Sequence, residues 1–169
     1  MIIDLANHEL TWVRINYSGP DYELRTAATV VASLRGVHGE CGDRSWTFKL
    51  KGIFRRRVTV STPEGGEVAV LRWRHERGGA MELPEGRTMH FVPAVSASPP
   101  HWDWVGPDGR ALAHFKPRTG FDVAEGLVEI EQEAAGLSEL PLLVVLGEYL
   151  AGLLAWRRQA DYLVASRHG

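Results

Sequence analysis

Residues 140–156 read Leu-Pro-Leu-Leu-Val-Val-Leu-Gly-Glu-Tyr-Leu-Ala-Gly-Leu-Leu-Ala-Trp, a helical stretch that is apolar around almost its whole circumference. Such helices lie inside a protein or a membrane, because in water they would expose nonpolar surface on every face. These residues rise only about 25 Å as a helix, whereas the hydrocarbon core of a bilayer is about 30 Å thick. A charge at Glu148 adds to the free energy of insertion. We therefore expect an enclosed helix and no transmembrane span, with a membrane tail anchor as the less favoured alternative.

The residues before this helix read as short strands in which apolar and polar side chains alternate, separated by turns rich in Gly, Pro and Asp. The pattern predicts eleven strands, at residues 10–16, 22–26, 28–34, 45–50, 54–61, 68–75, 80–83, 87–92, 101–105, 110–116 and 127–132. No helix-length segment separates consecutive strands, which favours antiparallel pairing over a parallel sheet.

We therefore predict a mainly β fold with a single domain over residues 1–169. Its strands, over residues 10–132, form a closed antiparallel β-barrel of about 11–12 strands wrapped around the buried C-terminal α-helix. The helix is expected at about residues 138–158, with a short tail at 159–169. Ser138 is a suitable N-cap, and Arg157 and Arg158 suit the negative end of the helix dipole.

The overall charge is close to neutral but unevenly distributed. A formal net charge of −2 argues against a nucleic-acid binder. Residues 44–87 hold ten Lys or Arg and five acidic residues, whereas residues 119–156 hold seven acidic residues and no Lys or Arg. We therefore expect a molecule with a basic side and an acidic side.

The N-terminal sequence and the cysteine content bear on the cellular location of the protein. The N-terminal residues lack the basic and apolar regions of a signal peptide, so we expect a cytoplasmic protein, peripheral at the membrane if the basic side binds lipid. The single cysteine, Cys41, has no partner for an internal disulfide. We expect no cofactor.

The strongest candidate site is basic. With Trp46, Phe48, Leu50, Val58, Val60, Leu71 and Trp73 facing inward, strand alternation points the intervening cations outward. These cations are Lys49, Lys51, Arg55, Arg57, Arg72 and Arg74. Such a ridge suits an anionic membrane lipid, another anionic ligand or an acidic protein surface. The alternative is a solvated barrel exterior whose cations prevent edge-to-edge pairing.

A resemblance supports this architecture. Residues 46–58 read Trp-Thr-Phe-Lys-Leu-Lys-Gly-Ile-Phe-Arg-Arg-Arg-Val, which resembles the Trp-x-Phe and Gly-aromatic-Arg hairpin of the LURP-one-related proteins. That family belongs to the tubby C-terminal-like group, together with the phospholipid scramblases. The resemblance continues loosely through residues 67–70, 107–110 and the leucine-rich helix, and covers about residues 22–156.

The resemblance implies a twelve-stranded barrel threaded by its C-terminal helix, acting as a binding module at membranes or on lipids. It implies no catalysis. The phosphoinositide-binding residues of tubby proteins and the calcium segment of scramblases cannot be assigned to individual residues of this chain, so the resemblance extends to the fold and not to a site.

Catalytic and metal signatures are weak. The seven histidines show no paired metal-binding spacing, and no phosphate-binding loop or nucleophile elbow is present, so we predict no metal site and no catalytic residues. His101 and Asp103 share one strand face opposite Trp102 and Trp104, as any alternating strand would arrange them. A small enzyme or ligand carrier with a pocket at a barrel mouth, using His101 and Asp103 or Glu148, is the second hypothesis.

Overall fold

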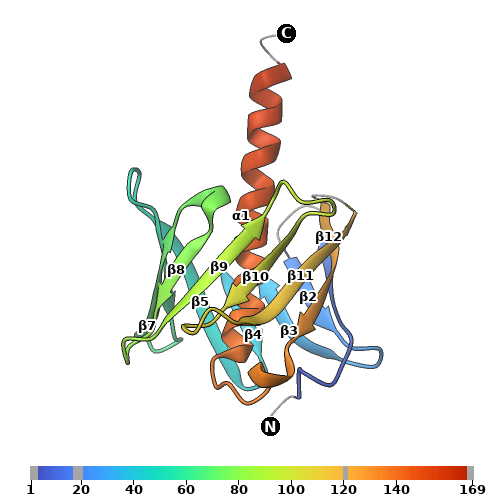
Figure 1. The fold of residues 1–169 in the computed structure, drawn as a ribbon, viewed down its shortest axis with the longest axis vertical. Coiled ribbons are helices and arrows are strands. Elements are labelled where there is room, and N and C mark those ends of the chain that lie inside the picture. The colour runs from blue at the N-terminus through green and yellow to red at the C-terminus, as the bar shows by residue number, and fades with distance from the viewer. Residues whose placement is uncertain (1–3, 17–20, 120–121, 167–169) are drawn as a thin grey trace.

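A computed structural model of the chain describes residues 4–16, 21–119 and 122–166, and only the backbone for residues 118–119, 122–124 and 156–166. It is a closed barrel of twelve antiparallel strands around one long helix (Figure 1). Every strand pairs with its sequence neighbours, and β1 pairs with β12 to close the barrel. This confirms the predicted fold class. The strands are β1 Leu10–Asn16, β2 Asp21–Arg25, β3 Val30–Arg35, β4 His38–Cys41, β5 Arg44–Lys51, β6 Arg57–Ser61, β7 Glu67–Trp73, β8 Gly79–Glu82, β9 Thr88–Ala94, β10 His101–Val105, β11 Ala111–Thr119 and β12 Asp122–Ile130.

Helix α1 (Leu140–Ser166) runs through the barrel and continues past one rim (Figure 1). Every side chain from residue 142 to residue 148 is buried, and Leu143, Val144, Val145 and Leu146 have no solvent exposure. Removing each such side chain from water is worth up to about 1.5–3 kcal/mol, so enclosure of this helix is a major source of stability. Within the described chain, no helix has both the length and the apolarity to cross a bilayer.

The helix bounds differ from the sequence prediction. The Glu139 carbonyl accepts a hydrogen bond from the Leu143 N–H at 2.9 Å, so the helical pattern starts one residue after the predicted cap. The Ser138 carbonyl accepts a hydrogen bond from the Arg44 guanidinium instead. The helix also continues beyond Arg158 to Ser166, because arginine is itself a good helix former and two cations do not end a helix.

Close contacts with the barrel wall fix the position of the enclosed helix. The Trp104 indole N–H donates a hydrogen bond to the Leu143 carbonyl at 2.7 Å. A Cβ atom at Gly147 would lie 2.4 Å from the Phe115 ring, so the glycine allows the helix and β11 to approach. Large aromatic side chains of the wall therefore fill the space beside small residues of the helix.

Strand β4 is absent from the sequence prediction. Its residues, His38–Cys41, include one glycine and one apolar side chain, so alternation is hard to recognise. A Cβ atom at Gly39 would lie 2.4 Å from the Val145 side chain and 2.9 Å from the Phe48 ring. The residue that weakens the strand signal is therefore the one that lets β4 approach the helix.

The two ends of the barrel differ. The guanidinium groups of Arg44 and Arg87 contact Ser138 and Glu139, which places the start of α1 at the rim of the β4–β5 and β8–β9 turns. Because consecutive strands are antiparallel, the β5–β6 and β7–β8 turns lie at the opposite rim, where α1 leaves the barrel (Figure 1). We call this end the exit rim. Two short 3₁₀ helices, η1 (His75–Arg77) and η2 (Gln132–Ala134), follow β7 and β12.

Candidate anionic-surface site

Strands β5, β6 and β7 bring three of the predicted cations into one row. Lys51 is directly opposite Arg57, and Arg57 is directly opposite Arg72, with all three side chains exposed. The adjacent positions Val58 and Leu71 have no exposure and face the interior, as alternation predicts. The local sequence therefore places three positive charges across three neighbouring strands.

The other three predicted cations lie around this row. Lys49 lies on β5 two residues further from the exit rim than Lys51, and it is directly opposite Thr59 of β6. Arg74 follows β7, and its backbone N–H donates to the Gly78 carbonyl at 2.7 Å, closing the turn that contains η1. Both side chains are exposed. We refer to Lys49, Lys51, Arg55, Arg57, Arg72 and Arg74 together as the basic cluster.

The placement of Arg55 corrects the sequence prediction. We expected a strand over residues 54–61, whereas β6 begins at Arg57 and Arg55 lies in the hairpin that connects it to β5. The ladder ends there, because Gly52 has a φ of +89° and turns the chain back on itself. Arg55 therefore contributes its charge from the exit rim and not from the barrel wall. Leu50, predicted to face inward, is 37% exposed near the end of β5.

Most of the basic cluster lacks an acidic partner within the described part of the chain. Arg72 forms an ion pair with Glu82, whereas the described residues provide no ion pair for Lys49, Lys51, Arg55, Arg57 or Arg74. Like charges directly opposite one another in a sheet repel, so this arrangement opposes the stability of the fold. An anionic ligand would neutralise it.

The opposite side of the barrel carries several acidic residues. In the ring of twelve strands, β12 lies six strands away from β6 in either direction. Glu125 and Glu129 lie on β12 and Glu131 directly follows it, with Glu129 paired to Lys116 at 2.7 Å. These acidic residues lie across the barrel from the basic cluster, and two of them pair with cations of β11, Glu129 with Lys116 and Glu131 with His114.

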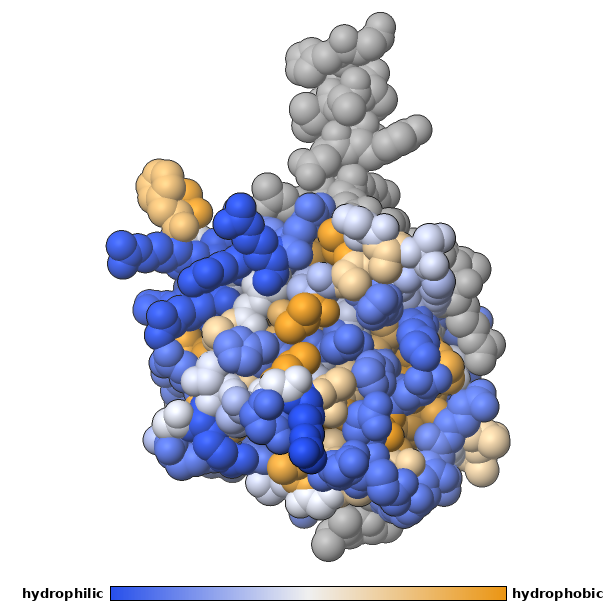
Figure 2. Space-filling view, in the orientation of Figure 1, coloured by the Kyte–Doolittle hydropathy of each residue, from blue (hydrophilic) through white to orange (hydrophobic). Residues whose placement is uncertain are grey.

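Two apolar residues of the site were not predicted. Ile53 is 83% exposed and Phe54 is 97% exposed in the β5–β6 hairpin, next to Arg55 and Arg56. Figure 2 shows this apolar tip projecting beyond a strongly hydrophilic part of the surface. Sequence alternation assigned Phe54 to a strand, because it does not show where the hydrogen-bonded ladder ends. Gly52 predicts a turn at this point, but it does not show that the connection continues to Arg56.

The residues of the second hypothesis are dispersed. The His101 ring lies 3.4 Å from the Pro99 carbonyl oxygen, whereas Asp103 contacts His114, a residue that the sequence analysis missed. Asp103 and His114 are directly opposite each other on β10 and β11. Pairing of these two strands was the signal for this contact, since cross-strand neighbours interact.

His114 is held between two carboxylates. Its Nδ1 lies 2.8 Å from Asp103 Oδ1, and its Nε2 lies 2.7 Å from Glu131 Oε1. Partial burial opposes protonation, but the hydrogen bonds to Glu131 and Asp103 outweigh it and raise the pKa of His114. Since ionised carboxylates only accept hydrogen bonds, this geometry suits the imidazolium form. These three residues form a charge network on the outer wall of the barrel that joins β10, β11 and the end of β12.

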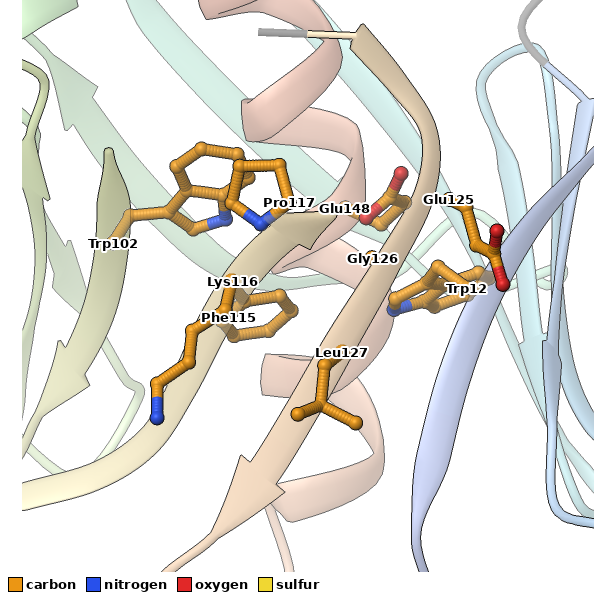
Figure 3. Close-up of a pocket in the computed structure, with 9 residues that line it drawn as sticks. All are labelled: Trp12, Trp102, Phe115, Lys116, Pro117, Glu125, Gly126, Leu127 and Glu148. Carbon is orange, nitrogen blue, oxygen red and sulfur yellow. The ribbon is translucent and has the colours of Figure 1, made fainter. Parts of the chain in front are cut away.

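Glu148 is buried inside the barrel, at 4% exposure. It lines a cavity of about 10 Å³ together with Trp12, Trp102, Lys116 and Glu125, and Figure 3 shows the two indole rings on either side of it. Burial raises the pKa of Glu148 to about 8, so it is protonated at neutral pH. This volume is at the lower limit for one water molecule and far below that of a ligand pocket.

Larger depressions lie at the other rim, where α1 begins. One, of about 620 Å³, is lined by residues that include Arg87, Leu112 and Glu131. A second, of about 370 Å³, is lined by residues that include Arg44, Glu85 and Leu142. Neither is lined by His101, Asp103 or Glu148, so the groups of the second hypothesis do not converge on them.

Nucleophile and metal chemistry have little support in the described residues. Burial raises the pKa of the Cys41 thiol to about 11, which keeps it protonated and unreactive. Among the residues whose side chains the structure describes, no group of three His, Cys, Asp or Glu residues could hold a metal ion.

Comparison of the chain with protein-family models, curated proteins and solved structures finds no match. The resemblance to the LURP-one-related proteins therefore stays a prediction. The geometry of the basic cluster is therefore the main guide to the function of this protein.

Proposed function

We propose that this protein is a non-enzymatic binding module for anionic membrane surfaces, and that the basic cluster is its binding site. The observation that carries the proposal is the row Lys51, Arg57 and Arg72, together with the lack of acidic partners for most of the cluster among the described residues. Each basic residue near an anionic leaflet contributes about 1 kcal/mol of attraction. The cluster as a whole is therefore sufficient for reversible attachment.

The charge distribution supports a defined orientation on such a surface. The basic cluster is centred on β6, and the acidic residues of β12 lie on the far side of the barrel. Attraction of the basic cluster to an anionic surface would turn β5–β7 toward the membrane. A peripheral location at a cytoplasmic membrane and a relationship to tubby-like proteins are parts of the same proposal.

The test is co-sedimentation with phosphatidylserine-containing and purely neutral vesicles at low and high salt. We expect binding only to the anionic vesicles, with a loss at high salt because exposed charges are screened. Arg55→Glu combined with Arg57→Glu should weaken binding by a factor of about ten or more, from the charge contributions given above.

The matched control is Arg25→Glu combined with Arg110→Glu, which changes the net charge equally. Arg25 pairs with Glu23 and Arg110 pairs with Asp108, away from the basic cluster. This variant should retain substantially more binding than the cluster variant. Equal losses in the two variants would show that net charge, and not this site, governs binding.

A further inference from the structure

The apolar tip of the β5–β6 hairpin stands apart from the rest of the described surface. The other large apolar side chains that are exposed, Val30, Val37, Leu50 and Val92, are between 37% and 50% exposed. Ile53 and Phe54 are exposed almost completely, at 83% and 97%. Their side chains contribute little to the packing of the barrel, so fold stability does not account for their chemistry.

The turn that presents these residues has a defined conformation. Gly52 has a φ of +89°, and a Cβ atom there would lie 2.4 Å from the Arg55 carbonyl oxygen. At the base of the hairpin, the Trp73 N–H donates a hydrogen bond to the Arg56 carbonyl at 2.9 Å, which ties the hairpin to β7. Ile53 and Phe54 are therefore displayed at the end of an ordered turn, beyond the exit rim (Figure 1).

Positive charge surrounds the tip on both sides. Lys51 precedes it and Arg55, Arg56 and Arg57 follow it, and the described residues provide no ion pair for any of the four. An apolar end within a collar of cations matches the boundary of an anionic bilayer, where acyl chains lie directly beneath negative headgroups. A protein partner would instead need an apolar pocket with an acidic margin of matching shape.

From this geometry we infer that Ile53 and Phe54 insert into the interfacial region of an anionic bilayer while the adjoining cations contact the headgroups. The inference rests on the proposed function and adds a mode of attachment to it. Transfer of two large apolar side chains out of water is a favourable contribution that salt does not screen. The electrostatic cluster would therefore attract the protein to the surface, and the tip would prolong its attachment.

Insertion can be followed with an environment-sensitive fluorophore on Ile53→Cys, because the buried thiol of Cys41 is a poor competitor for labelling. Val30→Cys provides the matched control site. Val30 is 50% exposed and follows the β2–β3 turn, at the opposite end of the barrel from the hairpin tip. On anionic vesicles, we expect a blue shift and quenching by shallow lipid-attached quenchers at position 53 and not at position 30.

The companion variant is Ile53→Ser combined with Phe54→Ser. Both positions are exposed, so unfolding should be unchanged while the affinity for anionic vesicles falls about tenfold or more. Salt-sensitive binding that this variant retains in full, with the position 53 probe still in water, would overturn insertion and leave the proposed function intact. Failure of the wild-type protein to bind anionic vesicles at all would overturn both.

A contact between two copies of the chain is the other outcome that would overturn insertion. It would appear as self-association of the wild-type protein in sedimentation velocity that the double serine variant abolishes, with no change in vesicle binding. Self-association of that kind would assign the tip to a protein interface.

Discussion

The enclosed part of α1 and the tip of the β5–β6 hairpin present the same class of side chain in opposite environments. Leu143 and Leu146 have no solvent exposure, whereas Phe54 is 97% exposed. The helix is apolar because the barrel is built around it, and its sequence is explained by folding alone. The hairpin tip gains little from folding, so its apolar character points to a contact outside the chain.

Charge shows the same contrast. On the β10–β11 side, His114 lies between two carboxylates, and its charge network belongs to the folded structure. On the β5–β7 side, cations lie opposite cations. The β10–β11 side is electrostatically self-sufficient, whereas the β5–β7 side carries the site that we propose for an anionic surface. Variants of each region should therefore separate stability from binding.

The largest expected effect contrasts Leu143→Ala with Phe54→Ala. Truncation of the fully buried leucine should reduce the free energy of unfolding by about 2–5 kcal/mol, because it leaves a cavity beside the helix. Phe54→Ala should change that free energy by less than about 0.5 kcal/mol, because the ring is in solvent. Urea denaturation measures both. A large loss of stability in Phe54→Ala would break the comparison and show that the ring packs against the barrel.

The next effect concerns Glu148, the one acidic side chain that is buried among the described residues. The pKa of Glu148 is about 8 in the folded protein against an ordinary value of 4.5, so the folded state binds the proton more tightly than the unfolded state. The stability that this proton contributes is fully present below pH 4.5 and declines as the pH rises toward about 8. The loss from this residue between pH 5 and pH 7 amounts to about 2–3 kcal/mol.

Glu148→Gln should remove most of that decline, because its side chain stays neutral across this range. The readout is the free energy of unfolding of wild type and variant at several pH values. Lys116 and Glu125 line the same cavity, and their charges are retained in the variant. An unchanged pH profile in Glu148→Gln would mean that another group titrates in this range.

The fold could be predicted from the sequence because one physical requirement is unusually demanding. The apolar stretch at residues 140–156 carries Glu148 at its centre and is too short to cross a bilayer, so it has to be enclosed. The residues before it read as a series of short strands, which can enclose it only as a sheet. What the sequence did not reveal was β4, because Gly39 meets the need for a small residue at the helix contact and weakens the alternation that marks a strand. A local pattern cannot register a contact with Val145, more than a hundred residues away.

The candidate site was predictable where it depends on strand alternation and was missed where it depends on strand ends. Lys51, Arg57 and Arg72 face outward because Val58 and Leu71 face inward, and alternation determines this. The exposure of Ile53 and Phe54 depends instead on where hydrogen bonding between β5 and β6 stops. The contact between Asp103 and His114 depends on the register of two strands, which no single segment specifies.

A smaller effect is expected for the self-sufficient side of the barrel. His114→Asn removes an imidazolium held by Asp103 and Glu131, and should cost less than about 1 kcal/mol because the group is partly exposed. Since the folded pKa is raised, the contribution is fully present below the ordinary value of 6.5 and is lost as the pH rises through the folded value. Unfolding at pH 6 and pH 9 should therefore show a larger deficit at pH 6. An equal deficit at the two pH values would mean that packing, and not charge, is lost.

The smallest effect has the opposite sign and sharpens the comparison most. Arg57 lies directly opposite Lys51 on one side and Arg72 on the other, so its charge is repelled by both neighbours. Arg57→Gln should increase the free energy of unfolding by a few tenths of a kcal/mol at low salt, and the gain should disappear at about 1 M salt.

The same substitution should weaken attachment to anionic vesicles, because it removes a headgroup contact. Arg110→Gln is the matched control, since Arg110 pairs with Asp108 and its removal relieves no repulsion. A loss of stability in Arg57→Gln would show that the arginine serves the fold after all. A gain in stability together with a loss of binding would show instead that the repulsion is retained for the partner, since an anionic surface turns three opposed cations into three favourable contacts.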